Sequence, residues 1–326
     1  MSITTPLTSH VTLEELSRGA VVSEDSVTFP GAEEPARIRR VDSDGVGIAV
    51  YEWGDPDAPP LLLMHGGFDF ARTFDVFAPL LAKGGWRVVS WDHRGHGDSD
   101  QAAFNSFAAD VRDVAAVMDS TSAGKFPIVA HSKGGAMSLR LAEAWPHRFS
   151  HLVNIDGLAA RRHMPDVSDT ERTALLTTEL AGWLDHRRTM SSFQRKPDTL
   201  MGLAQRRALM NPRLSIEWLC RLVTVGARRD PDGWRWKLDP MMRMGGFGPW
   251  RPEWSLEALP GLNMPFLGLL GMQPERMGWG TEPSDLKPYL PRGGRLEVFE
   301  NAGHFIHIEQ PGAVAVMVLD FLGTPR

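Results

Sequence analysis

The sequence predicts an α/β fold in which helices cover both faces of a mostly parallel sheet. Short, continuous apolar segments alternate with helical patterns along most of the chain, as expected for strands buried on both faces. Residues 158–260 interrupt this alternation with helical patterns and no clear strands, and the alternation resumes after them. We therefore expect one sheet with a helical insertion between two of its strands.

The predicted elements follow in chain order. Two strands, Ile38–Val41 and Val46–Trp53, flank an Asp-Gly pair that is typical of a hairpin turn. The other predicted strands are Pro60–Met64, Arg87–Trp91, Pro127–Ala130, His151–Ile155, Pro265–Leu270 and Arg295–Phe299. The predicted helices are Phe74–Lys83, Phe107–Ser120, Gly134–Trp145 and Pro311–Leu322.

These elements divide the chain into three parts. Residues 1–36 form a polar N-terminal extension, either packed on the main body or loose from it. Residues 37–157 and 261–326 form the α/β core. Residues 158–260 form a helical cap over the carboxyl edge of the sheet, which is where open α/β sheets bind ligands.

Composition excludes several classes of protein. Of 326 residues, 42% are hydrophobic and 23% are charged, which is typical of a globular chain. A net charge of −5 argues against a nucleic-acid partner. The one cysteine, Cys220, excludes an intrachain disulfide. No secretory signal and no apolar segment of membrane-spanning length is present, so we expect a soluble protein without a membrane partner. The single cysteine fits a reducing cytoplasm, and we expect a monomer or a homodimer.

Ser132 lies in the segment that bears most directly on chemistry. An apolar strand from Phe126 leads through Ala130-His131-Ser132-Lys133-Gly134 into a helical pattern, close to the G-x-S-x-G of a nucleophile elbow. Small residues are needed on both sides because the strained turn approaches neighbouring elements closely. The simpler alternative is a helix N-cap at Ser132, since serine is common there.

Further segments favour the nucleophile. The strand that ends at Met64 runs into His65-Gly66-Gly67-Phe68, and His304 lies in a loop after the last strand. With the turn segment 92–99, these motifs occur in an order that resembles the α/β-hydrolase family over about residues 38–322. The resemblance implies an α/β-hydrolase fold with an inserted helical cap.

A serine hydroxyl needs an adjacent base, and His304 is the matching base. The backbone N–H groups of Gly67 and Lys133 would form the oxyanion hole, with Phe68 as an alternative second donor and a substrate contact. The Lys133 side chain is expected to point to solvent or to the cap.

The acid that orients His304 has two candidates. Asp156 ends the strand that begins at His151, and Glu275 follows the strand that ends near Leu270. The usual family position after the later strand holds Pro274, and some family members place their acid after the earlier strand. We favour Asp156, with Glu275 as the alternative acid; the remaining alternative is that neither residue is the acid.

Other polar residues have simpler explanations. His93 and His96 belong to the turn motif, so neither a metal nor a cofactor is expected. His131 and His307 are expected to be structural. Residues 158–260 hold 17 basic against 12 acidic residues, interpreted mainly as a solvated face, with Arg161 or Arg162 as candidates for binding an anionic group of the substrate.

These features predict a cofactor-independent serine hydrolase. Its small-molecule substrate is expected to be a small-to-medium, largely apolar carboxylic ester or lactone, cleaved through an acyl-enzyme on Ser132. One alternative is a carbon–carbon bond hydrolase acting on a diketone-like ring-cleavage product. Another is a ligand-sensing protein of the same fold without turnover.

Overall fold

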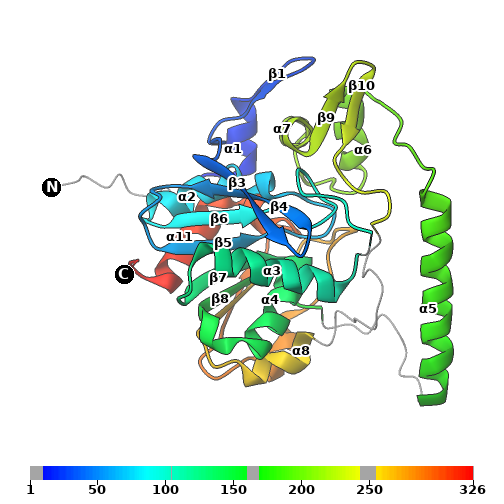
Figure 1. Cartoon of the computed structure of the whole chain (residues 1–326). Helices are drawn as coiled ribbons and strands as arrows, with labels where there is room; N and C mark the ends of the chain where they lie inside the picture. The colour runs from blue at the N-terminus through cyan, green and yellow to red at the C-terminus, as the bar shows by residue number, and fades with distance from the viewer. Residues whose placement is uncertain (1–9, 104, 160–168, 243–254, 326) are drawn as a thin grey trace.

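An eight-stranded sheet forms the centre of the protein in a computed structural model that describes residues 10–103, 105–159, 169–242 and 255–325 (Figure 1). The strand order is β12-β11-β8-β7-β5-β6-β4-β3. The β3–β4 and β4–β6 pairs are antiparallel, and the other neighbours are parallel, which confirms the predicted fold class. The strands are β3 (Arg37–Ser43), β4 (Val46–Trp53), β5 (Pro60–Met64), β6 (Arg87–Trp91), β7 (Phe126–His131), β8 (Phe149–Ile155), β11 (Phe266–Gly271) and β12 (Arg295–Phe299).

The central strands are apolar throughout because both faces of the sheet are covered. In β5, Leu61 and Leu63 enter one hydrophobic core, and Leu62 and Met64 enter the other. Helices α2 and α11 pack together on one face, whereas α3, α4 and α8 cover the opposite face. The core helices are α2 (Phe77–Lys83), α3 (Phe107–Thr121), α4 (Lys133–Ala144), α8 (Ser255–Ala258), α9 (Pro283–Leu286), α10 (Ile306–Glu309) and α11 (Pro311–Leu322).

Short 3₁₀ turns supplement these helices. They cover Ala71–Phe74, Pro146–Arg148, Leu259–Gly261 and Lys287–Tyr289. The helix predicted to begin at Phe74 begins at Phe77 instead, because a 3₁₀ turn precedes it.

Residues 158–260, called the insertion below, contain helices α5 (Asp169–Met190), α6 (Leu200–Ala208) and α7 (Ile216–Gly226). At the end of this range, α8 packs against the core helix α4 and so belongs structurally to the core. They also contain an antiparallel hairpin of β9 (Ala227–Asp230) and β10 (Gly233–Trp236). The prediction of no strands is therefore wrong at this hairpin, which the turn signal Pro231-Asp232-Gly233 could have revealed. In Figure 1, α6, α7 and the hairpin lie together above the sheet, and α5 runs along the edge of the molecule.

The N-terminal segment packs against the insertion. It forms helix α1 (Leu13–Arg18) and a hairpin of β1 (Val21–Val22) and β2 (Val27–Thr28). Leu13 and Phe29 belong to a third hydrophobic core with Trp218 of α7, where the rings of Phe29 and Trp218 meet edge to face at 5.0 Å. The described part of the predicted extension is thus packed, not loose.

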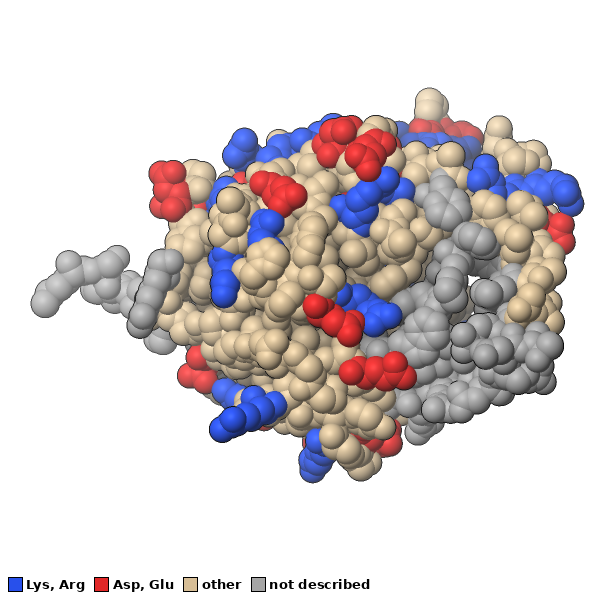
Figure 2. Space-filling model, turned by 60° about the horizontal axis from the view of Figure 1, so that its bottom comes forward, with Lys and Arg blue, Asp and Glu red and all other residues tan. Residues whose placement is uncertain are grey.

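Charged residues mark both edges of the large sheet. The outermost strand β3 carries Arg37, Arg39 and Arg40, and β12 at the other edge carries Arg295 and Glu297. On the face shown in Figure 2, positive and negative side chains lie scattered among uncharged ones. Within the described ranges, no helix is both long and apolar enough to cross a membrane. Cytoplasmic location, oligomeric state and the lack of a nucleic-acid partner stay predictions.

Candidate active site

Ser132 occupies a tight turn between β7 and α4. Its backbone has φ 53° and ψ −121°, a conformation that costs energy for any residue except glycine. The turn presses the start of α4 against β5, since a Cβ at Gly134 would lie 2.7 Å from the carbonyl oxygen of His65. Only 8% of Ser132 is exposed. The turn therefore has the strained strand–turn–helix geometry of a nucleophile elbow.

His304 links Ser132 to Asp156. The histidine lies in the loop between β12 and α10 and is 2% exposed. Its Nε2 is 2.9 Å from the Ser132 Oγ, and its Nδ1 is 2.6 Å from the Asp156 Oδ2. With a proton on Nδ1, the histidine donates to Asp156 and accepts from the Ser132 hydroxyl. This arrangement can accept the serine proton and stabilise the resulting imidazolium.

The end of β11 fixes the orientation of Asp156. Asp156 follows β8 with φ 45°, and its N–H donates to the Leu269 carbonyl at 2.8 Å. Its Oδ1 accepts a hydrogen bond from the Gly271 N–H at 3.3 Å, which leaves Oδ2 for His304. Of the two predicted acids, the structure brings Asp156 to the imidazole ring.

Glu275 contacts the backbone of His304 instead of its ring. Its Oε2 accepts the His304 N–H at 3.1 Å. Burial raises the pKa of Glu275, and nearby Glu309 raises it further, while His304 and Arg213 act in the opposite direction. Within the described residues, the Glu275 Oε1 has no hydrogen-bond partner. The side chain is therefore placed to hold the loop that carries His304.

The two predicted oxyanion donors belong to segments that lie next to the nucleophile. Lys133 is the first residue of α4, so its N–H has no partner within the helix. A Cβ at Gly66 would lie 3.1 Å from the Ser132 Cβ, which shows that the loop bearing Gly67 touches the nucleophile. The Phe68 N–H, the alternative second donor, donates to the His96 Nε2 at 3.2 Å.

The Lys133 side chain is buried, so the expectation that it points to solvent or to the cap is wrong. Its Nζ donates to the Asp110 Oδ2 at 2.5 Å. Helix α3 presents Asp110 beside the start of α4, and this long-range contact cannot be read from the elbow motif.

Buried histidines surround the site. Burial lowers the pKa of His93 to about 4 and that of His96 to about 3. His131 and His307 are also buried, with ring centroids 4.5 Å apart. The His131 Nε2 is 2.9 Å from the His304 carbonyl oxygen. In the parts of the chain that the structure describes, no group of three or more His, Cys, Asp or Glu residues could hold a metal ion.

Two arginines near the site were not predicted. Arg207 donates to the Phe68 carbonyl, and Arg213 donates to the Asn301 carbonyl. Sequence carries no signal that separates them from the other arginines of the insertion, because their contacts depend on distant loops. The anion-binding candidates at 161 and 162 lie outside the described residues.

Known proteins resemble the chain in sequence and in structure. A family model described as alpha/beta hydrolase fold matches residues 59–311. Serine hydrolase-like protein DDB_G0286239 of Dictyostelium discoideum is 31% identical over 119 residues, which cover 34% of this chain. The chain spans 32% of that relative's length.

A second relative aligns over most of its length. Esterase Rv0045c of Mycobacterium tuberculosis is 25% identical over 285 residues, which cover 85% of this chain and 87% of the esterase. Among solved structures, the thioesterase domain from the curacin biosynthetic pathway has a TM-score of 0.72 at 22% identity, with 87% of this chain and 99% of that domain covered. These relatives support a hydrolase. The chain belongs to the alpha/beta hydrolase fold family.

Proposed function

We propose that the protein is a serine hydrolase that cleaves a carboxylic ester or lactone through an acyl-enzyme on Ser132. The observation that carries this proposal is the pair of hydrogen bonds at His304, 2.9 Å to the Ser132 Oγ and 2.6 Å to the Asp156 Oδ2. A nucleophile, a base and an orienting acid in this order are the requirements of acyl transfer. The scheme requires no cofactor.

Acylation begins when the Ser132 Oγ attacks the substrate carbonyl carbon and its proton passes to the His304 Nε2. The carbonyl oxygen gains a negative charge, which the N–H groups of Gly67 and Lys133 stabilise. Asp156 stabilises the imidazolium and keeps its ring in place. The carbonyl then re-forms, the bond to the leaving alcohol breaks, and His304 donates its proton to the alcohol oxygen.

Deacylation repeats these steps with water. His304 removes a proton from water, the hydroxide oxygen attacks the acyl carbon, and the same two N–H groups stabilise the second oxyanion. The carboxylic acid leaves as Ser132 regains its proton from His304. Water is a reactant only in this half of the cycle.

We infer that the substrate is small to medium and largely apolar. Phe68, which directly follows Gly67 and is partly exposed, would offer an aromatic surface beside the reacting carbonyl. An apolar surface of this kind would bind an alkyl or aryl group of the ester, because burying that group is favourable.

Reaction with a small fluorophosphonate tests the proposed function. Intact-mass analysis should show one adduct on the wild-type protein and none on Ser132→Ala, because only an activated serine attacks the phosphorus. Esters and lactones of graded size would then identify the preferred acyl and alcohol groups. An unmodified wild-type protein would contradict the proposal, and binding measurements by thermal shift would then test the ligand-sensing alternative.

A further inference from the structure

Arg207 of α6 reaches from the insertion to the loop that follows β5, residues 65–68, which is called the oxyanion loop below. Its Nη1 donates to the Phe68 carbonyl at 3.0 Å, and its side chain is 12% exposed. The Phe68 N–H donates to the His96 Nε2 at 3.2 Å. Phe68 has φ 59°, a strained conformation that persists only when its surroundings enforce it. Arg207 and His96 therefore fix both ends of this residue, next to Gly67.

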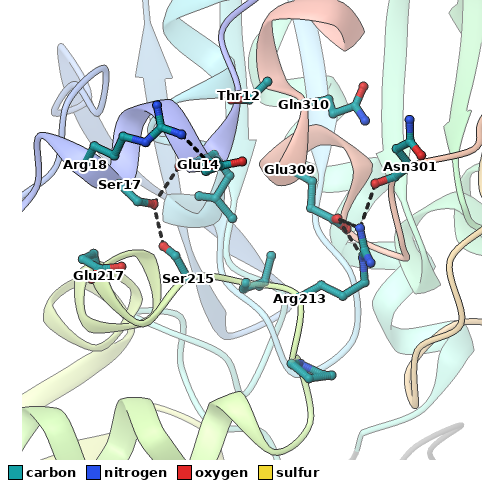
Figure 3. Close-up of a pocket in the computed structure, with 13 residues that line it drawn as sticks. Thr12, Glu14, Ser17, Arg18, Arg213, Ser215, Glu217, Asn301, Glu309 and Gln310 are labelled. Atoms are coloured by element: carbon teal, nitrogen blue, oxygen red, sulfur yellow. Dashed lines mark hydrogen bonds and ion pairs between the residues drawn. The ribbon is translucent and has the colours of Figure 1, made fainter.

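Arg213 reaches the second active-site loop. Its Nε and Nη2 bind the Glu309 Oε2 at 2.9 and 2.8 Å, and its Nη2 also donates to the Asn301 carbonyl at 2.7 Å (Figure 3). The Glu309 Oε1 in turn accepts the Gly303 N–H at 2.8 Å. Arg213 thus holds Asn301 directly and Gly303 through Glu309, and these two residues come shortly before His304 in the same loop.

The His304 loop packs tightly against Arg213 at Gly303. A Cβ at Gly303 would lie 2.8 Å from the Arg213 Cδ and 2.9 Å from the Glu275 Cδ, so the loop packs tightly between the two side chains. Figure 3 shows Arg213, Glu309 and Asn301 on the wall of an open groove next to α1. The side chain of Arg213 is 29% exposed there, which makes the ion pair accessible from solvent.

One short segment carries both arginines. The Asn211 N–H donates to the Arg207 carbonyl at 3.0 Å, and the Leu214 N–H donates to the Asn211 carbonyl at 3.2 Å. Asn211 is fully buried. The backbone between the arginines is therefore fixed by hydrogen bonds and a buried anchor, so a displacement of one arginine would also move the other.

We propose that Arg207 and Arg213 are positioning residues that hold the oxyanion loop and the His304 loop at their working separation. The inference rests on the proposed function and extends it, because both loops act on the same carbonyl group. Oxyanion donors and the base must be placed to a fraction of an ångström, and a misplacement of about 1 Å can cost about 100-fold in rate. The insertion would then determine the geometry of the reaction as well as cover it.

Fluorophosphonate labelling kinetics test this role. Arg207→Met and Arg213→Met should each lower the limiting rate of Ser132 labelling by about 10- to 100-fold, while the half-saturating probe concentration stays within about threefold. Arg207→Lys and Arg213→Lys should recover part of the rate because lysine can still donate to the carbonyl. The matched control is Arg206→Met, since Arg206 is 59% exposed and pairs with Asp198 on the insertion.

Hydrogen–deuterium exchange supplies a readout that does not depend on activity. Arg207→Met should speed exchange in residues 65–72, and Arg213→Met should speed it in residues 300–306, whereas the Arg206→Met control should change neither segment. The proposal is overturned if both Met variants label at the wild-type limiting rate, or if neither segment exchanges faster. If wild type itself is not labelled, the proposed function fails, and exchange alone decides whether the arginines hold the loops.

Discussion

Substitution of Asp156 by asparagine replaces one carboxylate oxygen with an amide nitrogen at nearly constant size. The Gly271 N–H points at the Asp156 Oδ1, so the amide oxygen of asparagine must remain there, because an amide N–H would face another donor. The new NH₂ group then faces the His304 Nδ1. His304 must accept at Nδ1 and carry its proton on Nε2, facing Ser132.

This tautomer cannot accept the serine proton. The comparable loss in a serine protease triad lowers kcat by about 10⁴-fold, equivalent to about 5 kcal/mol of transition-state stabilisation. We expect a loss of this size for Asp156→Asn, because the Gly271 N–H leaves the amide no favourable alternative orientation. Folding should be little affected, since the side-chain volume and the hydrogen bond to Gly271 are both retained.

The assay is the hydrolysis of a p-nitrophenyl ester, with kcat normalised to folded protein by circular dichroism. The matched control is Glu275→Gln, whose amide oxygen can still accept the His304 N–H and which should keep kcat within about tenfold. The reasoning is refuted if Asp156→Asn retains a kcat within tenfold of wild type. Loss of activity in Glu275→Gln alone would identify Glu275 as the acid.

Three further predictions concern stability. Burial and Glu309 raise the pKa of Glu275, so the folded state favours the protonated carboxyl and the stability of the fold falls as pH rises through that pKa. Glu275→Gln removes this cost and should raise Tm at pH 7, and a lower Tm would contradict the reasoning. Asp110→Asn leaves the buried Lys133 charge unpaired and should lower the free energy of unfolding by about 3–5 kcal/mol, as measured by urea denaturation. A decrease of less than about 1 kcal/mol would argue against a buried ion pair. Burial lowers the pKa of His96 to about 3, so as pH falls the unfolded chain takes up a proton on this histidine before the folded protein does. The stability of the fold therefore declines as pH drops below about 6.5. His96→Asn should make this decline shallower between about pH 7 and pH 4.5, and an unchanged slope would refute the reasoning.

The parts of the fold that local patterns determine could be predicted from sequence. The apolar run of β5 predicts burial on both faces of a sheet, and the turn at Ser132 carries its own signal in the small residues around it. The position of His304 after the last strand of the sheet follows from the order of elements. Each of these features depends on residues close together in the chain.

The features that sequence could not determine depend on contacts between distant segments. Asp156 and Glu275 follow neighbouring strands, β8 and β11, so both carboxylates end near His304. The left-handed backbone at Asp156 and its hydrogen bond from the Gly271 N–H direct the Asp156 carboxylate to the His304 ring. Neither of these two features has a signature in the local sequence. Lys133 likewise meets Asp110 only because α3 packs beside α4.

The charged residues on β3 and β12 have a consequence for self-association. An outer strand exposes N–H and C=O groups that can pair with a strand of another chain and so start aggregation. Docking a second copy along β3 would crowd the charged side chains of Arg37 and Arg40, of which Arg40 is already paired with Asp100, against the partner strand. Any homodimer is therefore expected to use another surface, and neutralising these arginines should make the protein more prone to precipitate on heating.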